Sequence, residues 1–218
     1  MFGAWQAGAW RSLAHRFKPD LVVGASVGSL NGYAIAARWS AADLCHWWLR
    51  PGVANFENLP KLVHGLMDAR PLEIEYGVVM VDLLRMKPRT VKAPGVRPEH
   101  LLASCAVPLV AWPRRIDGRW YVDGGLLNPL PVWAAVELGA TRILALNALP
   151  EIPSALLRPF AKAFRAVLGH NPPLPSGVAL HTLTPQCPLG SMHDALYWKP
   201  ENAARWIEQG AADAADFG

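Results

Sequence analysis

The residues best suited to chemistry are a serine and an aspartate, each at the end of a short apolar run. Ser26 follows the run 21–23, and Asp123 follows the run 120–122. A serine hydroxyl becomes a nucleophile only when a nearby base accepts its proton. Asp123 is a candidate for that base because Gly124 and Gly125 follow it and permit close backbone approach. We interpret the two residues as a candidate pair for acyl transfer.

The spacing around the serine is typical of a nucleophile elbow. The segment Gly24-Ala25-Ser26-Val27-Gly28 has the pattern G-x-S-x-G between an apolar run and a helix-like pattern. Small residues two before and two after the serine let a strand and a helix pass closely. An ordinary structural turn is the alternative. A nucleotide-binding loop is disfavoured, because neither G-x-G-x-x-G nor the Walker pattern is present.

Histidines are the other candidates for the base. A chain order of Ser, Asp and then His would require His170, His181 or His193. Each of these histidines fits a loop or surface residue equally well. Asp123 also has an alternative interpretation, as an ordinary aspartate in a turn. We favour Asp123 because it follows a predicted strand.

Alternating strands and helices must position these residues. Apolar periodicity, caps and turn residues predict helices over 3–17, 29–38, 41–49, 59–67, 97–103, 132–138, 154–168 and 202–215. Strands are expected at 20–23, 76–82, about 90–91, 142–147 and 178–183, with a turn at Lys87-Pro88. A hairpin is expected at 116–122, with its turn at Asp117-Gly118. Ser40 is the expected N-cap of the third helix, and Gly139 the expected residue after the sixth.

This alternation predicts an α/β fold. We expect one domain over residues 1–218, a three-layer structure with a largely parallel central sheet and helices on both faces. Sites in such sheets form at the carboxyl ends of strands, where Ser26 and Asp123 both stand.

Composition narrows the classes of function. The net charge of +4 is scattered without a block of like charges, so nucleic acid is not an expected partner. Cys45, Cys105 and Cys187 are odd in number and widely spaced, which argues against a disulfide framework or a zinc site, and we expect no metal. Neither a secretory signal nor a membrane-spanning run is present. We therefore expect a cytoplasmic protein, with peripheral contact to a membrane as a further possibility.

Two segments are candidates for that lipid contact. The segment 44–50 carries Trp47 and Trp48 and fits either a lipid-facing rim or a helix that packs tryptophan into the core. The predicted helix around Arg158, Lys162 and Arg165 fits either an anionic headgroup surface or a solvated face, and the solvated face is favoured.

Three motifs together resemble one family. The elbow GASVG, the stretch ASCAVP at 103–108, and Asp123-Gly124-Gly125 with the following Asn-Pro-Leu-Pro-Val are similar to bacterial patatin-like phospholipases. The resemblance covers nearly the whole chain. It implies a serine–aspartate dyad of Ser26 and Asp123 that hydrolyses phospholipids or other acyl esters through an acyl-enzyme, without a cofactor.

One motif departs from that family. Its glycine-rich loop GGGxxG, which follows the first strand and supplies oxyanion donors, is matched only in its last three positions by Met1-Phe2-Gly3. The first strand and the leading glycines are missing, and Gly3 and the N–H of Val27 remain as expected donors. We favour a start upstream of Met1 over a weakened enzyme, since the sheet would otherwise expose an edge. Two alternatives stay open, a non-catalytic lipid-binding protein and an esterase or thioesterase for small soluble esters.

Overall fold

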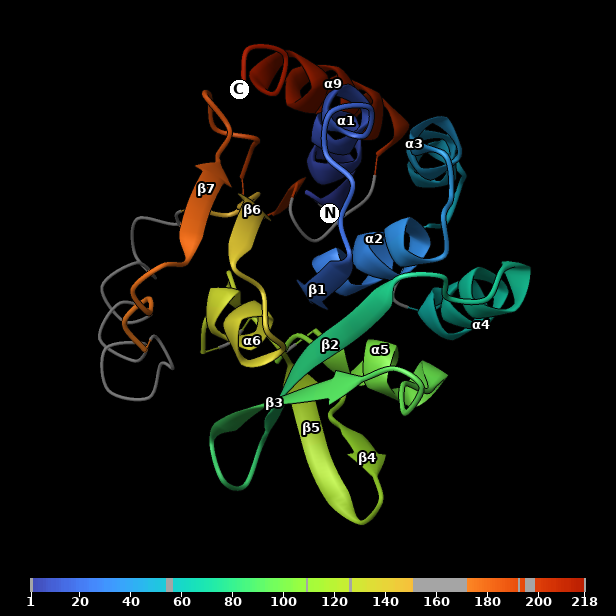
Figure 1. Ribbon diagram of the computed structural model, residues 1–218. Helices are drawn as coiled ribbons and strands as arrows, with labels where there is room; N and C mark the ends of the chain where they lie inside the picture. Colours follow the sequence, from blue (N-terminus) through green and yellow to red (C-terminus); the bar gives the residue numbers. More distant parts are fainter. Residues whose placement is uncertain are drawn as a thin grey trace.

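The computed structural model describes residues 2–53, 57–108, 110–125, 127–150, 172–191, 193–194 and 199–217 (Figure 1). Its helices are α1 (Gly3–Leu13), α2 (Val27–Ala36), α3 (Ala41–Leu49), α4 (Leu59–Ala69), α5 (Pro98–Ser104), α6 (Val132–Glu137) and α9 (Pro200–Asp213). Its strands are β1 (Leu21–Ala25), β2 (Glu75–Asp82), β3 (Lys87–Lys92), β4 (Arg114–Ile116), β5 (Arg119–Asp123), β6 (Arg142–Leu146) and β7 (Ala179–Leu183). The elements predicted within the described residues are present, and the α/β class is confirmed.

Local signals in the sequence explain several element ends. The Ser40 side chain accepts a hydrogen bond from the Asp43 backbone N–H at 3.0 Å and caps α3 as predicted. Asp117 and Gly118 have φ values of 48° and 81°, as a two-residue hairpin turn between β4 and β5 requires. Gly139 follows α6 with φ of 95°, which also agrees with the prediction.

The strands form a mixed arrangement, which corrects the expected largely parallel sheet. A five-stranded sheet has the order β1-β2-β5-β4 with β3 also paired to β2, and β6 and β7 form a second sheet. Among the described strands, β1–β2 and β6–β7 are parallel pairs, whereas β2–β3, β2–β5 and β4–β5 are antiparallel. Short turns join β2 to β3 and β4 to β5, and strands joined so tightly can pair only in antiparallel fashion.

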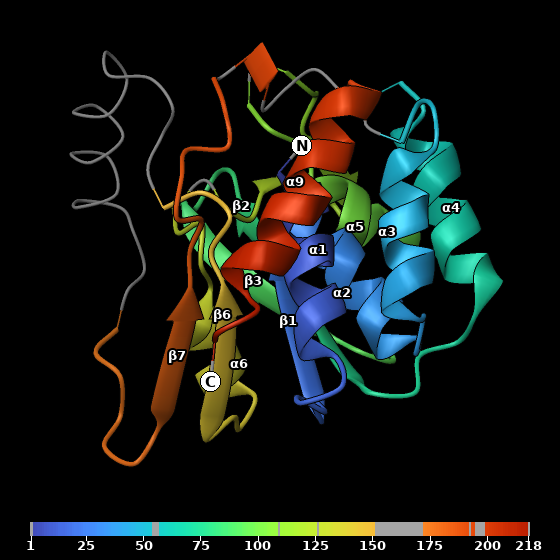
Figure 2. The same cartoon turned by 90° about the horizontal axis from the view of Figure 1, so that it is seen from above.

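Helices cover both faces of the large sheet, as the three-layer prediction requires. Val22, Tyr76 and Val78 face the main core, which the helices α1, α2, α3, α4 and α9 complete. Figure 2 shows these helices gathered on one side of the strands. Ala25 and Val79 face the opposite way and pack against α6. The elbow at the end of β1 therefore lies between two helical layers.

The first and last helices pack closely against each other (Figure 1). A methyl group at Gly8 would lie 1.9 Å from the carbonyl oxygen of Ile207, and one at Gly210 would lie 2.0 Å from that of Trp5. The Trp5 indole N–H donates to the Asp213 carboxylate at 2.7 Å in the same interface. The carboxyl-terminal helix thus fixes α1, which borders the candidate site.

Three further predictions concern a turn, a tryptophan-bearing segment and a basic helix. The turn expected at Lys87-Pro88 is wrong, because both residues already pair in β3 and the turn lies at 83–86. Trp47 and Trp48 are 4% and 1% exposed, so the segment 44–50 packs its tryptophans into the core rather than forming a lipid-facing rim. The helix predicted over 154–168, with Arg158, Lys162 and Arg165, lies outside the described residues.

Candidate active site

Ser26 occupies a strained position between β1 and α2. Its backbone has φ of 53° and ψ of −134°, an uncommon conformation for a residue with a side chain. Such strain costs on the order of 1–3 kcal/mol and persists only where the surroundings enforce it. The first-turn N–H groups of a helix have no acceptor within the helix, and Val27 is the first residue of α2. The serine thus lies at an electropositive helix end.

The two elbow glycines have different roles. A methyl group at Gly24 would lie 2.2 Å from the Gly28 carbonyl oxygen, so only glycine permits this contact between strand and helix. A methyl group at Gly28 would meet only the end of the Gln6 side chain, at 3.8 Å. The steric reason predicted for both glycines therefore holds for Gly24, whereas Gly28 contributes its backbone carbonyl to the contact.

Asp123 lies on β5, which pairs with β2 as the strand of the elbow does. Ala25 pairs with Val79 of β2, and Asp123 pairs with the next residue, Met80. A methyl group at Gly124 would lie 2.1 Å from the Val79 carbonyl oxygen and 3.1 Å from Ala25 Cβ. The structure thus places Asp123 on β5 and the elbow on β1 at successive levels of β2, the strand with which both pair.

The Asp123 carboxylate is buried and held by its own turn. The residue is 6% exposed, and its Oδ1 accepts a hydrogen bond from the Gly125 N–H at 2.7 Å. Its backbone N–H donates to the Ala106 carbonyl at 2.9 Å. Glycine at positions 124 and 125 therefore serves two purposes, a close approach to β2 and a donor to the carboxylate.

Ser104 joins the elbow to the aspartate turn. Its Oγ accepts a hydrogen bond from the Ser26 N–H at 2.9 Å and donates one to the Val79 carbonyl at 2.6 Å. Its own carbonyl accepts from the Gly124 N–H at 3.2 Å. The stretch around Ser104 carries part of the family resemblance, but no sequence pattern predicted a role for this residue. A small polar residue at the end of an apolar helix was the available signal.

The start of α1 is fixed to α2 through Asn31. The Asn31 amide donates to the Gly3 carbonyl at 2.9 Å and to Gln6 Oε1 at 3.0 Å, and its Oδ1 accepts from the Trp48 indole N–H at 2.7 Å. A methyl group at Gly3 would lie 2.3 Å from the Trp48 ring, so this position favours glycine. Gly3 was predicted from the sequence, whereas Asn31 was not, although it is the one amide side chain on the apolar helix α2.

Cys105 is the other nucleophilic side chain beside Asp123. Burial, and then the negative charge of Asp123, raise the pKa of its thiol from 9.0 to about 12. The thiol lies 3.9 Å from the Ser29 hydroxyl. Cys105 is 4% exposed and its thiol stays protonated at neutral pH, whereas Ser26 is half-buried at the start of α2, so Ser26 is the more accessible candidate nucleophile.

The histidines considered as bases lie elsewhere. His181 is exposed on β7, in the second sheet, and His193 is exposed near the carboxyl-terminal helix. His170 lies outside the described residues. His100 is buried on α5, but its Nδ1 accepts the Arg97 backbone N–H at 2.9 Å, and burial lowers its pKa. Its ring is thus engaged in capping α5.

A comparison with known protein families identifies the family of this chain. A sequence model of the family described as "Patatin-like phospholipase" matches residues 1–93 and 98–136. The chain belongs to the patatin-like phospholipase family. This assignment agrees with the resemblance noted from the elbow, the stretch 103–108 and the aspartate turn.

Individual relatives agree with this assignment. Uncharacterized NTE family proteins from Mycobacterium bovis and Mycobacterium tuberculosis are 27% identical over 145 residues, which cover 58% of this chain and 40% of each relative. The crystal structure of VipD from Legionella pneumophila matches with a TM-score of 0.56 at 12% identity, over 98% of this chain and 64% of that one. The match with VipD shows the fold. Family membership supports a lipid acyl hydrolase at the level of the family.

Proposed function

We propose that this chain is a serine lipid acyl hydrolase of the phospholipase A or lysophospholipase type, with Ser26 as nucleophile and Asp123 as general base. The observation that carries the proposal is the strained Ser26 backbone at the start of α2, together with a buried carboxylate at the end of β5, the strand that pairs with β2 just beyond β1. Strain of this kind is maintained at functional sites. Family membership supplies the substrate class, an acyl ester of a lipid.

The proposed reaction has two halves. Asp123 accepts the hydroxyl proton of Ser26 while Oγ bonds to the acyl carbonyl carbon, and the proton then passes to the departing alcohol. Water next attacks the acyl-enzyme and gives a proton to Asp123. The bond between the acyl group and Oγ then breaks as that proton returns to Ser26. The carboxylate thus acts first as base and then as acid.

Backbone amides are the proposed oxyanion donors. The N–H of Val27 leads α2, where the helix dipole favours negative charge. We assign the second donor to the region of Gly3, which Asn31 holds in place. Loss of one such donor typically slows catalysis by about 10²–10³.

Ester hydrolysis tests the proposal. We expect the chain to hydrolyse p-nitrophenyl esters and phospholipid in micelles, with activity lost in Ser26→Ala and Asp123→Asn but kept in His181→Ala and His193→Ala. Higher activity on monomeric than on micellar substrate would favour a small-ester esterase. Lipid binding without turnover by the folded chain would favour a non-catalytic lipid-binding protein.

For peripheral membrane contact we propose the two hairpins β2–β3 and β4–β5. Figure 1 shows both projecting from the body of the protein, and the Leu83 N–H donates to the Trp120 carbonyl at 2.8 Å between them. Leu84, in the turn between β2 and β3, is 80% exposed, and Trp120 on β5 is 42% exposed. Trp112, which lies two residues before β4, is 89% exposed. Residues 83–120 contain eight Lys and Arg and two acidic residues, a net charge of +6 against +4 for the whole chain. Exposed apolar side chains among basic ones suit an anionic bilayer surface.

Vesicle sedimentation tests this contact. No helix in the described part of the chain is long and apolar enough to cross a membrane. We expect Ser26→Ala to bind vesicles of phosphatidylcholine with phosphatidylglycerol better than phosphatidylcholine alone. Replacement of Leu84 and Trp112 by serine should reduce that binding at least about tenfold, because each contributes on the order of 1–3 kcal/mol of apolar transfer. Leu180→Ser, on exposed β7, is the matched control. Equal loss in both variants would overturn the assignment.

A further inference from the structure

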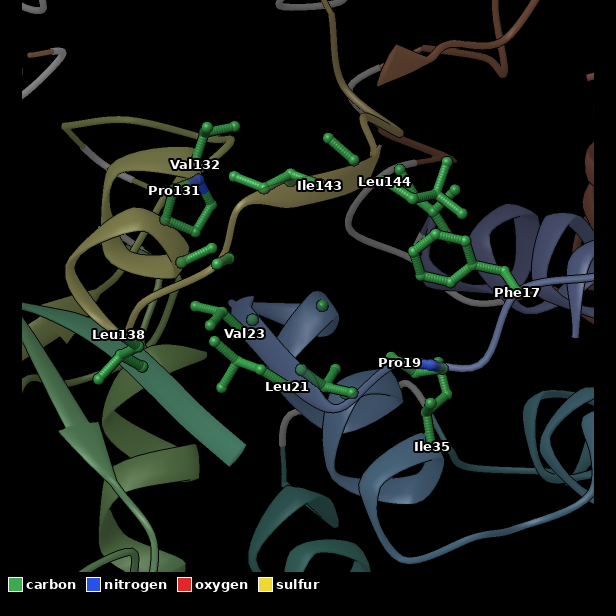
Figure 3. Close-up of a pocket in the computed structure, with 18 of the residues that line it drawn as sticks. Phe17, Pro19, Leu21, Val23, Ile35, Pro131, Val132, Leu138, Ile143 and Leu144 are labelled. Atoms are coloured by element: carbon green, nitrogen blue, oxygen red, sulfur yellow. The ribbon is translucent and has the colours of Figure 1, made fainter. Parts of the chain in front are cut away.

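Two parts of the molecule differ in the ligands they could accept. Figure 3 shows apolar side chains on both walls of the groove between β1 and β6, with Leu21 on one wall and Ile143 on the other. The volume of this groove is about 840 Å³. Apolar walls favour apolar groups, because a charged group loses its hydration there. The side chains suited to an anion lie instead on β3, β4 and β5.

Two arginines and a tyrosine share one face of the large sheet. Tyr121 of β5 pairs with Arg114 of β4 and, on its other side, with Asp82 of β2. Arg89 of β3 pairs with Met80, two residues before Asp82. Paired residues of neighbouring strands project to the same face of a sheet. The two arginines therefore approach Tyr121 from opposite sides.

Arg89 contacts the tyrosine directly. Its Nη1 donates to the Tyr121 hydroxyl, and its Cζ lies 5.7 Å from the centroid of the ring. Tyr121 is 1% exposed, whereas Arg89 is exposed. Within the described residues, Arg89 makes no further side-chain hydrogen bond. The buried ring thus holds one end of the guanidinium, and the other N–H groups of the planar fork remain free to bind a ligand.

Arg114 carries a buried donor that lacks an acceptor. The residue is half-buried, and its Nε is buried without a hydrogen-bond partner among the described residues. Such groups are rare in folded proteins, because burial removes the water that would otherwise compensate for the missing bond. An oxygen of a bound anion would supply the acceptor.

No carboxylate neutralises the two arginines. Over the described part of the chain, no Asp or Glu oxygen lies within 4.0 Å of a side-chain nitrogen of Arg89 or Arg114. Asp82 projects to the same face but has other partners. Its Oδ1 accepts the Arg85 backbone N–H at 3.1 Å, and its Oδ2 lies 3.9 Å from Arg119. Two uncompensated positive charges therefore remain around Tyr121.

We propose that Arg89 and Arg114 form a binding site for a phosphate group, with Tyr121 as the floor between them. The fork of a guanidinium matches two phosphate oxygens at once, which a point charge does not. Tyr121 precedes Asp123 by two residues on the same strand, so the phosphate would bind on the face that carries the Asp123 side chain. The site rests on the two unpaired guanidinium groups and is independent of the proposed catalytic roles.

Calorimetric binding to the full chain carrying Ser26→Ala tests the site. The probes are inorganic phosphate, sn-glycerol 3-phosphate and monomeric dihexanoylphosphatidylcholine, all at one ionic strength set with sodium chloride so that screening is constant. Arg89→Gln and Arg114→Gln remove one fork each, and Arg114→Lys keeps the charge without the fork. Arg115→Gln, at an exposed neighbour on β4, is the matched control. Circular dichroism verifies the fold of each variant.

The expected result is specific to the two forks. The dissociation constant of the probe that binds most tightly should rise at least about tenfold in Arg89→Gln, Arg114→Gln and Arg114→Lys, and less than about twofold in Arg115→Gln. Tightest binding of the phosphatidylcholine would support the site as one for a lipid headgroup, and tightest binding of inorganic phosphate would support it as one for free phosphate. Equal weakening in Arg114→Gln and Arg115→Gln would overturn the proposal, as would no binding of any probe at about 10 mM.

Discussion

The side-chain oxygen of Ser104 lies 2.9 Å from the backbone nitrogen of Ser26, whose N–H it accepts. The same hydroxyl donates to Val79, which pairs with Ala25 in the neighbouring strand. One buried side chain therefore fixes the turn that holds the candidate nucleophile and ties it to β2. This geometry predicts that Ser104 is a positioning residue for the elbow.

Ser104→Ala should destabilise the fold by about 1–3 kcal/mol, because it leaves a buried N–H and a buried carbonyl without this partner. It should also slow the reaction of Ser26 with a fluorophosphonate. The matched control is Ser12→Ala, which removes a 2.9 Å hydrogen bond to the Ala211 carbonyl in the α1–α9 interface. That variant should lose stability without slower labelling. Equal labelling rates in the two variants would contradict the positioning role.

Glycine-to-alanine variants test whether close backbone contacts require glycine at positions 24 and 124. Gly24→Ala and Gly124→Ala place a methyl group 2.2 Å and 2.1 Å from a backbone oxygen, so each should cost about 1–3 kcal/mol or more. A methyl group at Gly65, on α4, meets nothing within 4 Å, and Gly65→Ala should add roughly 0.5–1 kcal/mol of stability. Urea unfolding measures all three. A neutral Gly124→Ala would mean that Asp123 and its turn do not pack against β2 as described.

The three cysteines should differ in reactivity. Cys187 is exposed, whereas Cys45 and Cys105 are buried and burial raises the pKa of each thiol. A thiol reagent at pH 8 should therefore modify one thiol rapidly in the folded chain and three after unfolding. Cys187→Ser should abolish the rapid phase. Rapid modification of Cys105 would contradict its buried place beside Asp123.

The raised pKa of Cys105 also sets a pH dependence. The unfolded thiol ionises near pH 9.0 and the folded thiol near 12, so its stabilising contribution is complete below about pH 9 and declines as pH rises toward 12. The free energy of unfolding should fall more steeply between pH 8 and 10.5 in the wild type than in Cys105→Ala. Parallel slopes would contradict the assignment.

Sequence patterns located the elbow and the aspartate because local signals mark both. Gly24 and Ser26 carry the strand-to-helix turn, and Asp117-Gly118 fixes the hairpin that leads to Asp123. The pairing of β5 with β2 was not predictable, because it joins segments about 40 residues apart and alternation of helices and strands does not set strand direction. The contacts of Ser104 and Asn31 likewise depend on tertiary packing.

The structure adds what no sequence pattern contained, namely that β1 and β6 line the two sides of one groove. The lipid-facing interpretation of Trp47 and Trp48 was wrong because α3 turns both indoles into the core. A pattern of tryptophans alone does not distinguish an interface from a buried helix.

The central claim is that Asp123, without a histidine, activates Ser26. Its most direct test is the rate at which a fluorophosphonate labels Ser26, with the labelled peptide identified by mass spectrometry. In Asp123→Asn, whose fold is verified by circular dichroism, we expect labelling of Ser26 to slow at least about 10²-fold, the lower range for general base catalysis. His100→Gln, His181→Ala and His193→Ala should label at the wild-type rate. Unchanged labelling in Asp123→Asn, together with loss in any histidine variant, would contradict the account.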